Sequence, residues 1–289
     1  MPLIIIKDYA EVSGMIKESG MKLFGADFSG AKDPSKGIYY AQGTLKNRTL
    51  HIERLVHCDD RLDLLAAIHF SKSPWGVDFP FSIPVEAFKC FKVNNWPELI
   101  DTIVEYNRKE FDFFITDNGI DSCNGRCKES SLCCRANDAT INSFSPLKKV
   151  KPNVRMMTYA GLKFLSYVRR LGNTVYPFDQ FNEKVSRLYE VYPSDTWDQV
   201  GLSRSTDLEP FIKKFSERYG LKITIEKHMK NLTNLDQADA IVACVTLAYA
   251  LERYGLEDDW NRQHSWINDL EWANRHLEGL IVKVVGLFL

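Results

Sequence analysis

The sequence has no long hydrophobic run, no excess of either charge and no ligand-like spacing among its six histidines. Its first apolar run, residues 3–6, is far shorter than the roughly 20 residues that span a membrane, and no signal-peptide core follows it. We therefore expect a cytoplasmic protein with no membrane partner. The 37 Lys and Arg against 38 Asp and Glu give a net charge of -1. This balance excludes a polybasic protein held to its partner by bulk charge, but not a local basic groove.

The seven cysteines lack the pattern of a disulfide framework, because their number is odd and no secretion signal precedes them. Cys123, Cys127, Cys133 and Cys134 cluster as C-x3-C-x5-C-C. No C-x2-C knuckle and no nearby histidine accompany them, so a loop of reduced thiols is favoured over a structural zinc or iron–sulfur site.

Internal repeats and low-complexity linkers are also missing from the 289 residues, which favours one elaborated α/β domain, residues 1–289. Residues 1–20 are expected to form an N-terminal extension, and residues 85–186 are too long for a loop and must carry structure of their own. The expected strands are 22–28, 38–45, 49–57, 74–84 and 186–192, and the expected helices are 61–70, 96–109, 153–171, 208–220 and 235–254. Residues 278–286 are expected to be an edge strand or a docked tail.

Two aspartates end apolar strands. Asp27 lies near the end of the apolar segment 22–28. In a strand, Phe24 and Ala26 would face one side of this segment, and Gly25 and Asp27 the other. Asp78 ends the next apolar strand of this kind. Each carboxylate either caps a turn or requires a partner for its buried charge.

Three further acids follow along the chain. Glu190 alternates with Tyr189 and Val191 in an expected central strand, so it is buried and needs a cation. Asp239 begins a stripe of small apolar residues on the expected helix 235–254, and these residues would let the helix approach the sheet closely. Asp236 lies one turn earlier, where it either joins the other acids or favours the positive end of the helix.

Several carboxylates in one place repel one another unless cations neutralise them. Oxygen ligands without histidine select Mg²⁺ or Mn²⁺, and two such ions about 4 Å apart can activate water and stabilise the leaving oxygen of a phosphodiester. The residues alone therefore predict a two-metal hydrolytic site.

The order of the motifs resembles a known family. GADFSGA, GVDFPFSIP, CCRAND, LYEVYPSDTW, DQADAIVA and EGLIVKV follow one another between about residues 22 and 286. In this order and spacing the chain is similar to the predicted RNase H-like nuclease family known as domain of unknown function 429. The resemblance implies an α/β RNase H-like fold with a mixed five-stranded sheet, its second strand antiparallel, flanked by helices and enlarged by a largely helical insertion, 85–186, between strands 4 and 5.

The resemblance also implies site residues. Asp27, Asp78 and Asp239 correspond to the metal-binding acids of the superfamily. Asp236 and Glu190 are expected to complete or orient that site as catalytic residues. Arg135 and Asp138 fall in the R-x-x-D motif of the family, and Arg135 is expected to hold a phosphate through its planar guanidinium.

Basic and aromatic residues supply a candidate nucleic-acid surface. The densest basic stretch contains Arg126, Lys128, Arg135, Lys148, Lys149, Lys151 and Arg155. Lys148 and Lys149, with Arg135 and Asp138, are the expected substrate-binding residues, and a solvated loop is the alternative. Trp75, Phe79 and Phe81 either stack on bases or belong to the core.

The leading hypothesis is thus a nuclease that uses Mg²⁺ or Mn²⁺, two ions in all, to cleave DNA or RNA. A non-catalytic nucleic-acid-binding or assembly protein with the same fold is the alternative from a different class. A phosphotransferase of the actin-like branch is a second enzymatic alternative, but the sequence contains one of the two duplicated halves that such an enzyme needs.

Overall fold

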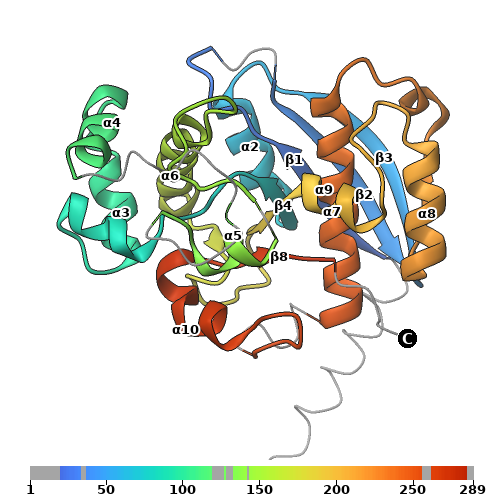
Figure 1. Ribbon diagram of the computed structural model, residues 1–289. Helices are drawn as coiled ribbons and strands as arrows, with labels where there is room; N and C mark the ends of the chain where they lie inside the picture. Colours follow the sequence, from blue (N-terminus) through green and yellow to red (C-terminus); the bar gives the residue numbers. More distant parts are fainter. Residues whose placement is uncertain are drawn as a thin grey trace, which may run out of the picture.

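The computed structural model describes residues 20–33, 37–118, 127, 133–141, 143–255 and 262–284, which form an α/β structure with one mixed sheet flanked by helices (Figure 1). The expected α/β class is confirmed. The strands are β1 (Met21–Asp27), β2 (Tyr39–Lys46), β3 (Thr49–His57), β4 (Pro74–Asp78), β5 (Thr174–Val175), β6 (Arg187–Val191), β7 (Lys222–Ile225) and β8 (Ile281–Val282). The α-helices are α2 (Arg61–Ser71), α3 (Trp96–Ile103), α4 (Arg108–Asp117), α5 (Ala136–Thr140), α6 (Val154–Arg170), α7 (Pro193–Gln199), α8 (Glu209–Tyr219), α9 (Leu235–Tyr254) and α10 (Asp269–Glu278), with 3₁₀ helices η1 (Val85–Phe91) and η2 (Lys227–Lys230).

The sheet runs in the order β5-β6-β4-β1-β2-β3-β7, and β8 pairs with β6. Among the described strands, β2 alone runs antiparallel to its neighbours. The expectation of five strands is wrong, because the described sheet has eight. The additional strands β5 and β7 are two and four residues long, too short for an alternating pattern to mark them. Strand β8 lies within residues 278–286, where an edge strand or a docked tail was expected.

The β2–β3 connection is a tight hairpin. Asn47 and Arg48 have φ angles of 49° and 58°, as a two-residue turn of the type that matches the right-handed twist of the strands requires. The chain therefore reverses at once, and β2 lies between β1 and β3.

Side chains alternate along the central strands and build a core on each face of the sheet. Leu23 of β1 belongs to the core that α8 and α9 cover, whereas Phe24 and Ala26 belong to the core that α2 and α6 cover (Figure 1). In β6, Tyr189 faces the first core and Leu188 the second. This alternation is the one predicted for both strands.

Residues 85–186 lie between β4 and β6 and contain η1, α3 to α6 and β5. The single helix expected over 96–109 is wrong, because two helices occupy this part of the chain. Asn107 caps α4 by accepting hydrogen bonds from Lys109 N and Glu110 N, and the Glu110 side chain accepts from Asn107 N in return. This capping box begins a new helix where a continuous one was expected.

None of the described helices combines the length and the apolar composition needed to cross a membrane. Of the expected N-terminal extension, residues 1–19 lie outside the described residues.

Candidate metal centre

Three of the predicted acids meet at one edge of the sheet. Asp27 ends β1 and Asp78 ends β4, and the two are register partners in this parallel pair. Asp239 lies in the second turn of α9. One carboxylate oxygen from each of the three lies within 4.8 Å of the others. The chain therefore brings together, from three separate elements, the acids that the sequence predicted as a group.

Two glycines allow α9 to lie close enough to the sheet. A Cβ atom on Gly25 of β1 would lie 2.0 Å from Cys244 N and 2.5 Å from Ala240 O, both in the backbone of α9. A Cβ atom on Gly76 of β4 would lie 3.0 Å from Ala243 O. Such distances leave no space for a side chain, so glycine at these positions is what holds Asp239 near the strand ends.

The three acids line a cavity of about 770 Å³. Its wall also includes Glu190 and Asp236, and Arg108, Arg135 and Arg204 supply cationic side chains. This volume lies within the roughly 300–1,000 Å³ range of pockets that bind small molecules and cofactors.

Burial and mutual repulsion perturb the acids. Burial, followed by the carboxylates of Asp78 and Asp236, raises the pKa of Asp27 well above its ordinary value, and Arg204 acts against this rise. Burial raises the pKa of Asp78 to about 7; Arg204 opposes this rise and Glu190 adds to it. Crowded carboxylates of this kind bind a proton or a metal ion more readily than exposed ones.

Asp236 lies in the first turn of α9 and lines the cavity beside Asp27. It is not a member of the three-acid group. Its position agrees with both predicted roles, a neighbour of the metal site and an acid at the positive end of a helix.

Arg204 is a site residue that the sequence analysis did not identify. It lies in the irregular segment between α7 and α8, and its guanidinium donates two hydrogen bonds to Asp239, from Nε to Oδ1 at 3.2 Å and from Nη2 to Oδ2. Asp239 is 1% exposed, whereas the side chain of Arg204 is 41% exposed. The buried carboxylates that the sequence predicts need a cation nearby, but no sequence pattern indicates which Arg or Lys side chain supplies it.

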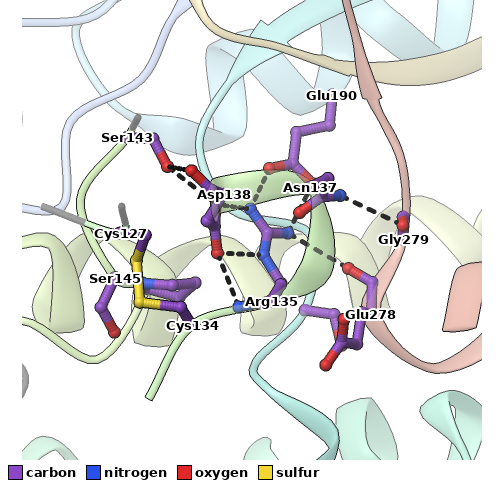
Figure 2. A network of polar contacts seen from close by, with 12 residues as sticks. Cys127, Cys134, Arg135, Asn137, Asp138, Ser143, Ser145, Glu190, Glu278 and Gly279 are labelled. Atoms are coloured by element: carbon purple, nitrogen blue, oxygen red, sulfur yellow. Dashed lines mark hydrogen bonds and ion pairs between the residues drawn. A yellow bond between two sulfur atoms is a disulfide. The ribbon is translucent and has the colours of Figure 1, made fainter. Parts of the chain in front are cut away.

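Glu190 has the cation that its burial required, and that cation is Arg135. Arg135 Nη2 lies 2.6 Å from Glu190 Oε1 and Nη1 lies 2.8 Å from Oε2, which also accepts a hydrogen bond from Phe81 N at 3.0 Å. Figure 2 shows this guanidinium held between the carboxylates of Glu190 and Asp138. Both oxygens of Glu190 are engaged in this contact, so the structure gives it an ion-pair role beside the three-acid group.

The expected phosphate contact of Arg135 does not fit the structure. The Arg135 side chain is 1% exposed, and its N–H groups donate to Asp138, Glu190 and the backbone oxygen of Glu278. These five hydrogen bonds use all five donors of a guanidinium. Asp138 is likewise buried, and it accepts hydrogen bonds from Arg135 and Ser143. Both residues line the cavity wall as a closed ion pair.

Glu278 is a further buried acid of this network that the sequence did not single out. It ends α10 and accepts hydrogen bonds from Ala136 N at 2.8 Å and from Val85 N at 3.0 Å. Burial raises its pKa, and those two backbone donors oppose the rise. Figure 2 shows it beside Arg135, where it joins the α10 end to the segment that begins α5.

The two predicted lysines do not lie in the cavity wall. Lys148 is buried, donates to Lys151 O at 2.9 Å and lies 3.7 Å from the centre of the Phe144 ring. Lys149 is half-exposed and pairs with Asp112 at 3.2 Å. The described part of the basic stretch is therefore divided between internal contacts and a surface ion pair. Buried Lys148 fits neither a phosphate-binding surface nor the solvated loop given as the alternative. Arg126 and Lys128 lie outside the described residues.

The three candidate base-stacking aromatics belong to the core. Trp75, Phe79 and Phe81 are each at most 1% exposed. Trp75 stacks on Phe24 with ring centres 4.3 Å apart. None of these rings is available to a nucleic acid base.

The cysteine expectation is wrong for part of the cluster. Cys127 and Cys134 form a disulfide with a Cα–Cα distance of 5.9 Å (Figure 2), and Cys133 is disulfide-bonded as well. Cys127 N donates to Ser143 O at 2.7 Å, which holds the cysteine beside the segment that carries Arg135. Cys58, Cys90 and Cys244 are buried free thiols, as expected, and Cys123 lies outside the described residues.

The loop after β1 is held by two arginines. Arg61 donates to the backbone oxygens of Ser29 and Ala31, and Arg108 donates to Gly30 O. A Cβ atom on Gly30 would lie 2.3 Å from Met157 Cα. These contacts fix the loop that follows Asp27 against the N-terminal turn of α6.

Comparison of the chain with protein-family models, with curated proteins and with solved structures finds no match in any of the three, so a function must be argued from the site itself.

Proposed function

We propose that this protein is a divalent-metal-dependent phosphodiesterase of RNase H-like fold that acts on nucleic acid. The observation that carries the proposal is the group formed by Asp27, Asp78 and Asp239, whose oxygens lie within 4.8 Å of one another. They open into a cavity of about 770 Å³, which is large enough to receive a nucleotide unit.

The donor set fits Mg²⁺ or Mn²⁺. All three groups are carboxylates, and no cysteine or histidine is among them. Hard oxygen donors favour these ions over Zn²⁺. The raised pKa values of Asp27 and Asp78 have the cause expected for such a group, namely buried carboxylates with too little positive charge nearby.

The sheet supports the fold part of the proposal. The central strands β3, β2, β1, β4 and β6 are consecutive neighbours, and β2 is antiparallel to the other four. This arrangement agrees with the five-stranded mixed sheet that the family resemblance implies, and β5, β7 and β8 extend it. The positions of Asp27 on the first strand, Asp78 on the fourth and Asp239 on the late helix agree with it too.

The roles of the residues follow from their contacts. Asp27, Asp78 and Asp239 would hold the ions, which when bound would activate a water molecule and stabilise the leaving oxygen of a phosphodiester. Arg108 lines the same cavity and offers positive charge to a phosphate. Arg135 and Glu190 hold the adjoining wall in place through their ion pair.

The alternative is a non-catalytic nucleic-acid-binding or assembly protein, and the ion pair between Arg204 and Asp239 favours it. This pair gives one of the three acids a counter-ion from the protein itself. A protein that needs no metal would neutralise its buried carboxylates in this way.

Metal binding separates the two proposals. Mn²⁺ should raise the melting temperature of the wild-type protein, because a ligand that binds only the folded state stabilises it. Asp27→Asn should remove this shift and should abolish cleavage of single-stranded, duplex and branched DNA and RNA. The variant should still fold, because a neutral amide of the same shape relieves the repulsion that raises the pKa of Asp27.

Asp117→Asn is the matched control, because Asp117 is an exposed acid at the end of α4, outside the cavity. This variant should keep both the Mn²⁺ shift and cleavage. A wild-type protein that shows neither a Mn²⁺ shift nor cleavage of any substrate would contradict the nuclease proposal and support the non-catalytic one.

A further inference from the structure

We propose that Arg204 is a displaceable counter-ion of the acidic site, which Asp239 exchanges for a divalent ion when the site is loaded. The inference rests on the proposed metal site. It adds that the protein itself competes for the site, so that metal occupancy and the position of the Arg204 guanidinium are linked.

Arg204 occupies a carboxylate that a bound ion would also need. Arg204 engages both oxygens of Asp239 through two hydrogen bonds, and Asp239 is one of the three carboxylates that could hold an ion together. A guanidinium and a divalent cation within a few ångströms of the same carboxylate repel one another strongly in a partly buried site. Asp239 therefore cannot serve both without a cost in free energy.

The charge of Arg204 lies within the acidic site. Its guanidinium pairs directly with Asp239, whose carboxylate lies within 4.8 Å of those of Asp27 and Asp78. Arg204 lines the same cavity as these acids, and its positive charge opposes the rise in the pKa of Asp27 and of Asp78. Arg204 therefore partly neutralises the three-acid group.

The Arg204 side chain is placed so that it can move away from Asp239. Its side chain is 41% exposed, and it lies in the irregular segment that joins α7 to α8. Both of its hydrogen bonds within the described structure go to Asp239. Arg135 contrasts with it, because that guanidinium is 1% exposed and is bound to two carboxylates and a backbone oxygen.

Once displaced from Asp239, the Arg204 guanidinium would be placed to contact a phosphate. The residue lines the same cavity as the three acids, so a guanidinium released from Asp239 stays at the cavity wall. There its planar fork matches the oxygens of a phosphate. The order of events would then be metal first and phosphodiester second, because the ion frees the group that contacts the phosphate.

The experiment measures Mn²⁺ affinity by isothermal titration calorimetry at fixed pH and physiological salt, with no nucleic acid present. Arg204→Gln should bind Mn²⁺ about tenfold more tightly than the wild type, since a partly exposed competing charge is removed. Arg253→Gln is the control, because Arg253 is an exposed cation in the last turn of α9, far along the helix from Asp239. Its Mn²⁺ affinity should equal that of the wild type.

A second variant guards against loss of the fold. Arg204→Lys keeps the positive charge but loses the fork that engages both oxygens, so its Mn²⁺ affinity should lie between those of the wild type and Arg204→Gln. In the absence of Mn²⁺, Arg204→Gln should melt at a lower temperature than the wild type, because buried Asp239 loses its partner. Added Mn²⁺ should reverse this difference.

Two results would overturn the inference, and they can be told apart. If Arg204→Gln binds Mn²⁺ no more tightly than the wild type while Asp27→Asn loses binding, Arg204 does not compete for the site, and the proposed function stands. If neither the wild type nor Arg204→Gln binds Mn²⁺, the metal site and the inference fall together.

Discussion

Asp195 shows how one buried residue links stability to pH. It lies in the first turn of α7, is 7% exposed, and accepts a hydrogen bond of 3.4 Å from Gln199. Burial raises the pKa of Asp195 to about 6, and Gln199 and Lys283 only partly oppose the rise. The residue lines a second cavity of about 300 Å³, away from the three-acid group.

We expect Asp195→Asn to stabilise the protein above pH 6. The folded carboxyl binds its proton more tightly than the unfolded one, so the stability from protonation is fully present below about pH 4. It is lost as pH rises through about 6, which is the folded value. The variant, which resembles the protonated form, should gain about 3 kcal/mol at pH 7.5 and less than about 1 kcal/mol at pH 4.

Urea unfolding of the wild type and the variant at both pH values measures this difference. Asp117→Asn is the control, because Asp117 is an exposed acid at the end of α4 and does not contribute to the raised pKa of Asp195. A stability difference between Asp195→Asn and the wild type that stays constant across this pH range would contradict the assignment.

The sequence identified the carboxylates of the site but not the arginines that pair with them. The positions of Asp27, Asp78 and Asp239 follow from strand ends and a helical stripe, which are local patterns. Arg204 reaches Asp239 from an irregular segment, and the path of such a segment depends on tertiary packing. For the same reason the sequence indicated that Glu190 needs a cation but could not show that Arg135 leaves no N–H for a phosphate.

At the scale of elements, the contact between β1 and α9 sets the geometry of the site. Gly25 meets the backbone of α9, and the residues of α9 that face the sheet are small. Overpacking at such a contact forces the backbone to move.

Gly25→Ala should therefore lower the free energy of unfolding by roughly 2–3 kcal/mol or more and should also weaken Mn²⁺ binding, because α9 carries Asp239 away from the strands. Urea unfolding and calorimetry measure the two effects. Gly37→Ala is the control for stability alone, because Gly37 lines the same cavity but a Cβ there meets nothing closer than 3.5 Å. Loss of stability in Gly25→Ala with unchanged Mn²⁺ affinity would show that the position of α9 does not govern the site.

Prediction of elements succeeded where patterns were long. The strands β1, β2, β3 and β6 and the helices α2, α6, α8 and α9 lie close to their expected bounds. The break between α3 and α4 depended on the capping box of Asn107, which competed with an apolar pattern that continues through it. The two-residue strands β5 and β8 exist only because β6 offers them a partner.

At the scale of the whole molecule, the Arg135 network joins parts that are distant in the chain. Arg135 precedes α5, Glu190 lies on β6, and Glu278 ends α10 (Figure 2). The buried network therefore attaches residues of the segment between β4 and β6 both to the sheet and to the last helix.

Arg135→Met should lower the free energy of unfolding by about 3–5 kcal/mol, because it leaves Glu190 and Asp138 buried without a cation. Arg48→Met is the control. Its ion pair with Glu252 lies at the surface, where the Arg48 side chain is 59% exposed, so the loss should be about 1 kcal/mol or less. Chemical denaturation compares the two, and equal losses would show that the Arg135 network is no stronger than a surface ion pair.

The sequence predicted the α/β class of the mixed sheet but not its number of strands. Three strands followed by a helix and a fourth strand indicate an α/β sheet that opens antiparallel, and β1 to β4 have this order. The outer strands β5 and β7 depend on pairing between residues far apart in sequence, which no local pattern reports. The short apolar segment 278–286 did indicate an edge strand or a docked tail, and β8 lies within it.

The spacing of the three acids along the chain has a consequence for synthesis on the ribosome. Asp27 and Asp78 lie on neighbouring strands, but Asp239 arrives only with α9. Translation at about 5–20 residues per second makes the wait between Asp78 and Asp239 on the order of ten seconds. A nascent chain therefore carries two of the carboxylates without the third, and the complete group forms only after α9 has left the exit tunnel.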